Sequence, residues 1–395
     1  MLKIPFYRAS IESPEIEAVT EVLRSGWLTT GPRVREFEAA FSTYIGQAHS
    51  VAVNSCTAAL HLALEAIGVK PGDGVIVPTM TFAASAEVVR YFDARPLLVD
   101  CREDDFNLDV EQAAAVVCAE RTAGRPVVAV VAVHYGGQIC DMPAVHRLAR
   151  AHGLRVIEDA AHCCPAFFRE AGGPWQSVGA GSDVSCFSFY ANKTITTGEG
   201  GMACTNQPDL ADRMRVMALH GISKDAWKRF TAEGSWYYEI VAPGFKYNLT
   251  DIAGALGLVQ LRKAERLHQC RTRLAERYVA ALADITEVIP PRQQPDRVHS
   301  WHLYVIRLRL DRLTINRADF ITKLKESGIG CSVHWMPLHM HPYYRQKYGF
   351  VPEAYPTAAR LFQEIISLPL FPDMTESEVD FVAGEIRRIA GAHRR

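Results

Sequence analysis

The chain has 395 residues, of which 48% are hydrophobic and 22% are charged, and this composition is typical of a soluble globular protein. Its 43 lysine and arginine residues nearly balance 44 aspartate and glutamate residues, which gives a net charge of −1. With no basic excess for nucleic acid and no polybasic tract for anionic membranes, we expect small-molecule partners. The length allows two domains or one large α/β unit with an appendage.

Neither a signal peptide nor a membrane span is predicted. Residues 1–19 lack a long apolar core and a small-residue cleavage site, and the longest apolar runs, such as Val127–Val133, are too short to cross a bilayer. The 10 cysteines include no Cys-x-x-Cys pair, so we expect no metal site and mostly reduced, buried thiols. These features predict a cytoplasmic protein.

Buried strands alternate with amphipathic helices between residues 51 and 219. Strands are expected at Val51–Val53, Val75–Pro78, Pro96–Val99, Val127–Val133, Arg155–Glu158 and Val184–Phe189, and helices at Ala58–Ile67, Ala83–Tyr91, Val110–Ala119 and Met142–His152. This alternation predicts βαβ units in a mostly parallel sheet that helices cover on both faces. Ligands bind such sheets at the carboxyl ends of the strands, so the residues after each strand are candidates for a site.

The second half of the chain predicts a smaller α+β domain. A helical pattern runs unbroken from Thr250 to about Ala283, and a proline-rich break follows at residues 289–295. The remaining expected elements are a strand at His302–Leu310, a helix at Arg317–Ser327, a short strand near Cys331, and helices near Ala354–Ile366 and Glu376–Ile389. We therefore expect a large domain of residues 1–255 and a small domain of residues 256–395.

Lys193 lies in a polar turn after the strand Val184–Phe189, and the residues Gly198–Gly201 close this turn. An ammonium group beside a buried strand is costly to desolvate. Desolvation lowers the pKa of a lysine, and a neutral amine can form a Schiff base with a carbonyl cofactor. Taken alone, a surface lysine in a glycine-rich hairpin is the simpler interpretation.

Asp159 ends the strand Arg155–Glu158. A carboxylate at the end of a buried strand is unfavourable unless it meets a cation or several donors, and the pyridinium nitrogen of pyridoxal phosphate would be such a cation. The alternative is an N-cap of the following helix. His162, three residues later, could lie beside the same ligand or make a purely structural hydrogen bond.

Other strand ends carry groups that suit a phosphate or a flat ring. The segment Asn54–Ala59 follows a strand and starts a helix, whose free N–H groups and dipole favour phosphate, and Ser55 and Thr57 add hydroxyl groups. Phe82 could stack on a cofactor, and Ser188 could reach a phosphate. Capping and core packing explain each residue separately. Together with Lys193 and Asp159, however, they make up the set that holds pyridoxal phosphate.

The sequence resembles the DegT/StrS family of sugar aminotransferases, which are fold type I pyridoxal phosphate enzymes. The resemblance covers nearly the whole chain and is carried in order by Ser25–Gly31, Val53–His61, Glu158–His162, Phe187–Lys193 with Thr196–Gly201, Gly244–Asp251 and Ser367–Pro372. It implies a large α/β domain with a mostly parallel, seven-stranded type of sheet and a smaller C-terminal α+β domain.

The resemblance also implies roles for single residues. Lys193 matches the lysine that forms the Schiff base and moves the proton, Asp159 matches the partner of the pyridinium nitrogen, and His162 matches a residue that supports the ring. The remaining cofactor contacts are implied for the stacking residue Phe82 and for the phosphate-binding residues Ser55, Cys56 (through its backbone), Thr57, Ser188 and Asn248. The last of these matches an asparagine that acts from the neighbouring subunit, which implies a homodimer with shared active sites.

The implied reaction moves an amino group from glutamate or glutamine, through the cofactor, to a keto group of a nucleotide-linked sugar. The segment Lys246–Asp251 and His334 resemble the subgroup that acts at carbon 4 and makes the 4-amino-4-deoxy-arabinose nucleotide. Substrate contacts are accordingly implied for Thr29, Lys246, Tyr247 and His334.

Two features depart from the family pattern, namely the long loop Phe167–Gly181 and Asn192 before the lysine. A cyclitol ketone as the amino acceptor stays open, and so does a cofactor-binding regulator without catalytic activity. Sugar 3-dehydration on this fold accompanies a histidine in place of the lysine, so Lys193 disfavours it.

Overall fold

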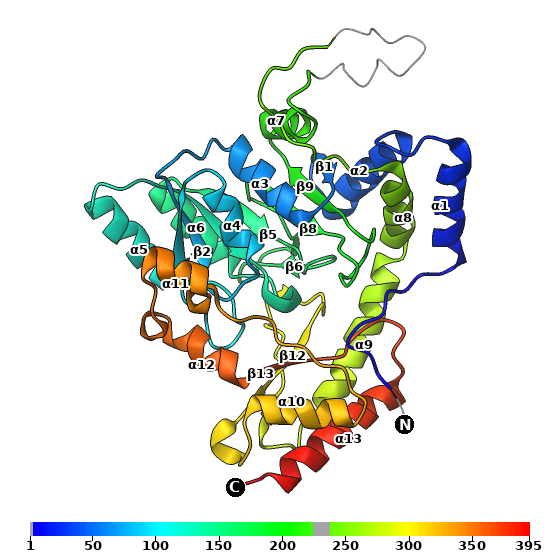
Figure 1. Cartoon of the computed structure of the whole chain (residues 1–395), viewed down its shortest axis with the longest axis vertical. Coiled ribbons are helices and arrows are strands. Elements are labelled where there is room, and N and C mark those ends of the chain that lie inside the picture. The colour runs from blue at the N-terminus through cyan, green and yellow to red at the C-terminus, as the bar shows by residue number, and fades with distance from the viewer. Residues whose placement is uncertain (1–2, 224–237) are drawn as a thin grey trace.

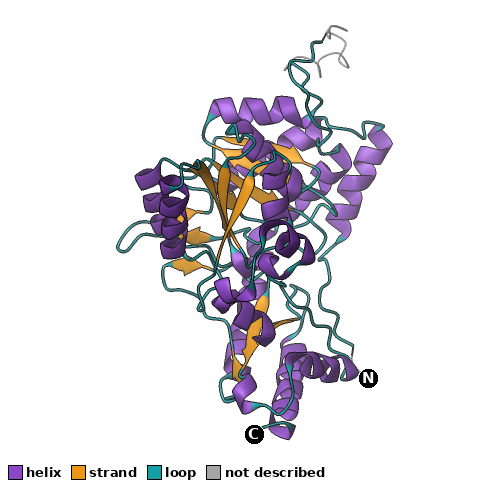
Figure 2. Cartoon of the chain, turned by 60° about the vertical axis from the view of Figure 1, so that its left-hand side comes forward, coloured by secondary structure: helices purple, strands orange, loops and turns teal. Residues whose placement is uncertain are grey.

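The computed structural model describes residues 3–223 and 238–395. A seven-stranded sheet lies at its centre, with helices on both faces (Figures 1 and 2). The strands follow the order β1 (His49–Val53), β9 (Gly201–Thr205), β8 (Val184–Ser188), β5 (Arg155–Asp159), β4 (Val127–Val133), β2 (Gly74–Pro78) and β3 (Arg95–Val99). The six strands predicted for this sheet are confirmed to within two residues at each end, and the α/β fold class is confirmed with them.

The sheet is parallel except at β9, which runs antiparallel to both of its described neighbours, β1 and β8. Because β1 and β8 are both antiparallel to β9, β1 runs in the same direction as β8, β5, β4 and β2. The carboxyl ends of these five strands therefore meet at one edge of the sheet, where ligands of such sheets bind.

Helices cover the two faces as the sequence pattern predicts. One face packs against α3 (Cys56–Ala66), α4 (Ala84–Arg90) and α7 (Pro208–Ala218), and the other against α2 (Pro32–Ile45), α5 (Val110–Thr122) and α6 (Met142–His152). Because both faces are covered, β4 consists entirely of valine and alanine and shows no polar alternation. The helix α1 (Ser13–Ser25), which the sequence analysis did not identify, packs against α8 (Asp251–Arg262).

The C-terminal half builds a second sheet of three strands, β10 (Val288–Ile289), β12 (Tyr304–Leu308) and β13 (Ile365–Leu368). It shares a core with α9 (Ala264–Leu282), α10 (Arg317–Glu326) and α13 (Glu376–Ala392). The N-terminal segment runs down beside α9 toward this core, which Ile4 joins (Figure 1).

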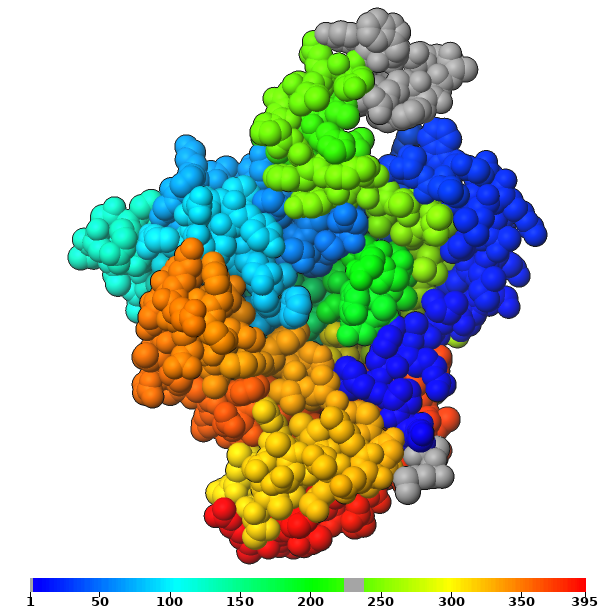
Figure 3. Space-filling model, in the orientation of Figure 1, coloured from blue at the N-terminus to red at the C-terminus, as the bar shows by residue number. Residues whose placement is uncertain are grey.

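The C-terminal half also folds back onto the large sheet through α11 (Pro342–Tyr348) and α12 (Pro356–Glu364). Asp100, just after β3, caps α12 by accepting bonds of 2.9 Å from the backbone N–H groups of Thr357 and Ala358. The space-filling view shows this orange segment seated against the cyan part of the large half (Figure 3). Residues far apart in the sequence therefore meet near the carboxyl edge of the sheet.

The unbroken helix predicted for Thr250–Ala283 is wrong, because α8 ends at Arg262 and α9 begins at Ala264. Lys263 between them leaves the helical conformation, with φ −106° and ψ 7°. Its ammonium group lies 2.6 Å from the carboxylate of Glu15 on α1, so a tertiary contact accompanies the break.

Two further predictions for the C-terminal half are wrong. Ile365 and Ile366 belong to β13 rather than to a helix, because they pair with β12. In place of the expected strand near Cys331 there are isolated bridges, between Ile4 and Ile329 and between Ser332 and Ser367.

The long loop Phe167–Gly181 contains β6 (Phe167–Phe168) and β7 (Gln176–Ser177), which form a third sheet with β11 (Arg297–Val298). Within the two described ranges, no helix is long and apolar enough to cross a membrane.

Candidate active site

A cavity of about 420 Å³ lies at the carboxyl edge of the large sheet. Nine of the residues predicted from the sequence line it, namely Ser55, Cys56, Thr57, Phe82, Asp159, His162, Ser188, Lys193 and His334. They come from the ends of β1, β2, β5 and β8 and, for His334, from the C-terminal half. The shared strand direction brings together the residues between Ser55 and Lys193, and the fold-back of the C-terminal half adds His334.

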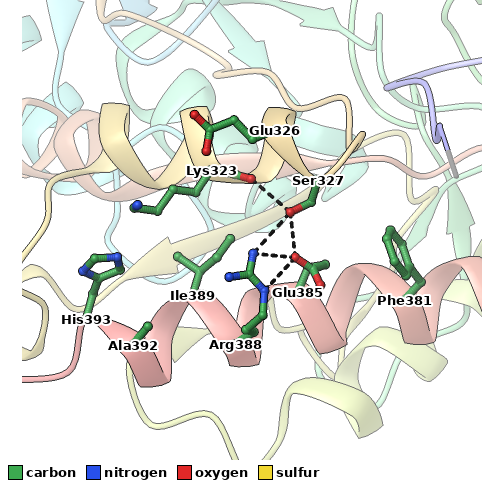
Figure 4. Close-up of a pocket in the computed structure, with 9 residues that line it drawn as sticks. All are labelled: Lys323, Glu326, Ser327, Phe381, Glu385, Arg388, Ile389, Ala392 and His393. Carbon is green, nitrogen blue, oxygen red and sulfur yellow. Dashed lines mark hydrogen bonds and ion pairs between the residues drawn. The ribbon is translucent and has the colours of Figure 1, made fainter. Parts of the chain in front are cut away.

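A second hollow, of about 450 Å³, lies between α10 and α13 (Figure 4). Two of its charged groups already pair, since Arg388 lies 2.7 Å from Glu385, and Ser327 donates a bond of 2.6 Å to the same carboxylate. None of the strand ends of the large sheet reaches it. The functional site is therefore assigned to the cavity at the sheet edge.

Lys193 has the properties that a reactive amine requires. Burial lowers its pKa from 10.5 to about 8, and the negative charge of Asp159 offsets only part of this shift. The backbone N–H of Lys193 donates a bond of 2.9 Å to the carbonyl of Tyr190, which fixes the turn that carries the side chain. At pH 8 about half of such amines are neutral and able to act as nucleophiles.

Asp159 is buried at the end of β5, and burial raises the pKa of its carboxyl group. Ser85 donates a bond of 2.7 Å to one carboxylate oxygen, and the backbone N–H of Ala161 donates one of 3.2 Å to the other. Two neutral donors leave the charge only partly compensated, so the site suits a cationic N–H group.

His162 is a neutral hydrogen-bond donor in the cavity. Burial holds its pKa well below the usual value. Its Nδ1 accepts a bond of 3.1 Å from the backbone N–H of Gly136, so the neutral ring carries its proton on Nε2. The ring stacks on Trp335, with centroids 5.0 Å apart and planes 19° apart.

The start of α3 lines one end of the cavity and could hold a phosphate. Ser55 caps the helix by accepting a bond of 3.1 Å from the N–H of Ala58, which leaves N–H groups of the first turn available for an anion. The hydroxyl groups of Thr57 and Ser188 line the same cavity. Gly201 on β9 keeps the approach open, because a Cβ there would lie 2.5 Å from the backbone carbonyl of Ser55.

Phe82 and His334 supply the aromatic part of the lining. The Phe82 side chain is 58% exposed, which leaves its ring uncovered for stacking. His334 bonds Ser367 Oγ through Nδ1 at 2.8 Å, and burial lowers its pKa to about 4. Both rings lie near Trp335, with centroid distances of 6.4 Å for Phe82 and 5.4 Å for His334.

Four predicted residues do not line the cavity of their own chain, namely Thr29, Lys246, Tyr247 and Asn248. The side-chain amide of Asn248 donates a bond of 2.7 Å to Thr30 and accepts one from Lys246. Tyr247 bonds His61 at 3.0 Å, and the backbone carbonyl of Thr29 accepts a bond of 3.2 Å from Asp251.

The structure adds residues that the sequence analysis missed, chiefly Ser85, which bonds Asp159, and the lining residues Tyr190, Glu199, His302 and Trp335. Ser85 lies at the start of α4, and its hydroxyl is 2.8 Å from that of Thr81, which precedes the helix. No pattern in the sequence pointed to His302 or Trp335.

The donor set fits pyridoxal phosphate, with an amine of lowered pKa, a buried carboxylate, an uncovered ring and a helix start for the phosphate. Among the described residues, no group of three or more histidine, cysteine, aspartate or glutamate side chains could hold a metal ion.

Comparison with known proteins agrees with this geometry. The model of the DegT/DnrJ/EryC1/StrS aminotransferase family matches residues 9–387. The chain belongs to this family. Because its members are pyridoxal phosphate enzymes, it is a pyridoxal phosphate-dependent aminotransferase, which confirms the expected enzyme class and cofactor.

Individual members of the family are similar over nearly their full length. The spore coat polysaccharide biosynthesis protein SpsC of Bacillus subtilis is 43% identical over 387 residues, which cover 98% of this chain and 97% of SpsC. Spr1654 of Streptococcus pneumoniae, classed among sugar aminotransferases, was solved with pyridoxal phosphate. Its structure matches this chain with a TM-score of 0.89 and 31% sequence identity, over 99% of both chains. DesV of S. venezuelae, solved with a ketimine intermediate, has a TM-score of 0.87, with 30% identity and 99% of both chains covered.

Proposed function

We propose that this aminotransferase transfers an amino group from glutamate or glutamine to a keto group, at carbon 4, of a nucleotide-linked sugar. The observation that carries the proposal is the buried Lys193 amine, with a pKa of about 8, in one cavity with the Asp159 carboxylate. The polysaccharide function in the name of SpsC and the sugar aminotransferase class of Spr1654 support a sugar as the amino acceptor. We also propose that the protein is cytoplasmic, as expected for an enzyme that acts on a nucleotide-linked sugar.

Bound pyridoxal phosphate supplies an aldehyde that accepts the amino group and a ring that withdraws electrons from the reacting carbon. The Lys193 amine would accept a proton from the amino-bearing carbon of the donor and deliver it to the cofactor carbon bound to the same nitrogen, which its pKa of about 8 permits near neutral pH. Asp159 would stay ionised against the ring N–H of the bound cofactor, whose positive charge would lower the pKa that burial raises. In this proposal Lys193 moves the proton, and Asp159 keeps the ring nitrogen protonated.

The other residues bind and orient the cofactor. In this proposal the backbone at Ser55 and Cys56 and the hydroxyl groups of Thr57 and Ser188 hold the phosphate at the start of α3. Phe82 would cover one ring face, and the Nε2–H of His162 would donate to a ring substituent.

His334 marks the side of the cavity where we place the sugar. It is neutral because burial lowers its pKa to about 4, so it offers a hydrogen bond without a charge. The rings of Phe82 and Trp335 lie near it and give an apolar surface of the kind that binds sugar rings or bases.

We propose that the enzyme is a homodimer in which Asn248 completes the phosphate site of the partner subunit. Asn248 lies outside the cavity of its own chain and bonds Thr30 at 2.7 Å. Trp27 and Leu28, close by in sequence to Thr30, are 38% and 45% exposed, and such exposed apolar side chains are typical of a protein interface. Thr29, Lys246 and Tyr247 would then contact the substrate bound by the partner subunit.

The experiment that tests the function has two stages. In the first, the visible absorbance of the purified protein is recorded before and after addition of glutamate or glutamine, and we expect a cofactor band that bleaches. In the second, the bleached protein is mixed with 4-keto and 3-keto nucleotide sugars and with a keto-cyclitol. Mass spectrometry then identifies which compound gains an amino group.

Amination of the 4-keto nucleotide sugar alone supports the full proposal. Amination of the cyclitol or of the 3-keto sugar overturns the proposed acceptor but still supports amino transfer through pyridoxal phosphate. A band that neither donor bleaches points to a cofactor-binding regulator and contradicts the proposed transfer.

A further inference from the structure

The segment His299–Leu303 connects the C-terminal half of the chain to the cavity. The backbone N–H groups of Ser300 and Leu303 donate bonds of 2.9 Å and 3.0 Å to the carbonyls of Gly137 and Gly136. The hydroxyl of Ser300, which is fully buried, donates a bond of 2.5 Å to the carbonyl of His162. The segment is therefore fixed to the backbone that follows β4 and β5 at the carboxyl edge of the sheet.

His302 packs directly against His162. Their ring centroids are 4.3 Å apart with planes 43° apart, and both rings line the cavity. His302 is 5% exposed, and its Nδ1 is buried without a hydrogen-bond partner. What His302 gives to His162 is therefore ring packing, which limits the orientations that the His162 ring can take.

The middle of the segment is anchored in the C-terminal half. Trp301 has a φ of 51°, a left-handed conformation that is unfavourable for a bulky side chain. The guanidinium of Arg271 on α9, which is 2% exposed, donates bonds of 3.3 Å to the carbonyl of Trp301 and 2.9 Å to that of Leu370. Strained backbone of this kind persists only where its surroundings hold it in place.

We propose that Ser300 and His302 are positioning residues that hold the His162 ring so that its Nε2–H remains directed at the cofactor. Ser300 fixes the backbone of His162, and His302 fixes its ring. The Gly136 N–H to Nδ1 bond fixes the proton on Nε2, so the ring position decides whether this donor is usable. The inference rests on the proposed function, because it takes the cavity to be the pyridoxal phosphate site.

The test measures binding of pyridoxal phosphate to the cofactor-free full chain and its His302→Ala, His302→Phe and Ser300→Ala variants. The readouts are the dissociation constant, the pH midpoint of the visible band of the bound cofactor, and the melting temperature without cofactor. His146→Ala is the matched control, because half-buried His146 lies on α6, on the face opposite α3, and bonds Ser182 at 3.1 Å.

We expect His302→Ala to raise the dissociation constant of the cofactor about tenfold and to shift the pH midpoint of the band. A tenfold change corresponds to about 1.4 kcal/mol of binding free energy, lost because the His162 ring is less well oriented. Ser300→Ala should act in the same direction. His302→Phe should bind within about twofold of the wild type, because it keeps the ring and the replaced Nδ1 had no partner. His146→Ala should change the melting temperature only.

Wild-type binding by His302→Ala overturns the inference, and so does a loss that His146→Ala reproduces at an equal change in melting temperature. A loss that His302→Phe shares means that His302 acts through a hydrogen bond, which also overturns it. If the wild-type chain binds no pyridoxal phosphate, the proposed function fails and this inference fails with it. If the wild-type chain binds the cofactor and His302→Ala binds it equally well, only this inference fails.

Discussion

Ser85 donates a hydrogen bond of 2.7 Å to the carboxylate of Asp159, and both side chains are buried. Thr81 lies 2.8 Å from the Ser85 hydroxyl. Because the single hydrogen of Ser85 goes to Asp159, Thr81 must donate to Ser85, and a chain of two hydroxyl groups points at the carboxylate. This chain lowers the pKa of Asp159 against the effect of burial, and it prepares the negative charge for a cationic ring nitrogen.

Ser85→Ala should raise the pKa of Asp159 further and weaken the binding of pyridoxal phosphate. Loss of a hydrogen bond to a buried charge costs about 1.5–3 kcal/mol, so we expect an increase in the dissociation constant of about ten- to a hundredfold. Titration of the cofactor-free protein, followed by absorbance, measures this. Ser50→Ala is the control, since Ser50 is equally buried but bonds Ser42 at 2.8 Å. Equal affinities of the two variants would contradict the role of Ser85.

The buried Lys193 should lower the free energy of unfolding of the cofactor-free protein, by an amount that depends on pH. Its pKa is about 8 in the folded chain against an ordinary value of 10.5, so the unfolded chain binds more protons between these values. Stability therefore rises with pH across this window, and the cost is fully present below pH 8. Lys193→Met should raise the free energy of unfolding by about 1–3 kcal/mol at pH 7, and by less as the pH approaches 10.

Urea denaturation of the cofactor-free proteins at pH 7 and at pH 9.5 measures this difference. The control is Lys70→Met, because Lys70 is exposed and should show no such trend. A gain for Lys193→Met that is the same at both pH values would show that packing, and not desolvation of the amine, is responsible.

Gly201→Ala should damage the proposed phosphate site at the start of α3. The added Cβ would lie 2.5 Å from the carbonyl of Ser55 and 2.6 Å from the backbone nitrogen of Cys56, and backbone atoms can yield only if the start of α3 moves. We expect a loss of about 1–3 kcal/mol in stability together with weaker cofactor binding. Gly384→Ala in α13 meets no atom within 4 Å and should stabilise the protein by about 0.5–1 kcal/mol. Binding of inorganic phosphate that is unchanged in Gly201→Ala would argue against the assigned cradle.

The sequence predicted the part of the site that depends on strand direction. Asp159, Lys193 and Phe82 follow parallel strands, and parallel strands end at one edge, so their meeting in one cavity follows from the pattern of buried runs. His302 and Trp335 could not be found in this way. Their positions depend on how the C-terminal half folds back, which is set by contacts such as that of Asp100 with α12 and not by any local pattern.

Element boundaries in the second half failed for the same reason. The periodicity of apolar residues is helical on both sides of Lys263, and the contact with Glu15, almost 250 positions away in the sequence, lies outside any local window. Ile365 and Ile366 fit a helical pattern equally well, and only their pairing with β12 makes them a strand.

The proposed sharing of the site between subunits predicts recovery of activity in mixed dimers. Lys193→Ala and Asn248→Ala should each be impaired when measured separately at limiting cofactor. If Asn248 serves the partner subunit, a hybrid dimer of the two variants contains one site with both residues intact. Random assembly makes half of the dimers hybrids, so co-expression should restore about a quarter of the wild-type sites. Donor-dependent bleaching of the cofactor band counts these sites. No recovery would place the action of Asn248 within its own chain, which its bonds to Thr30 and Lys246 outside the cavity argue against.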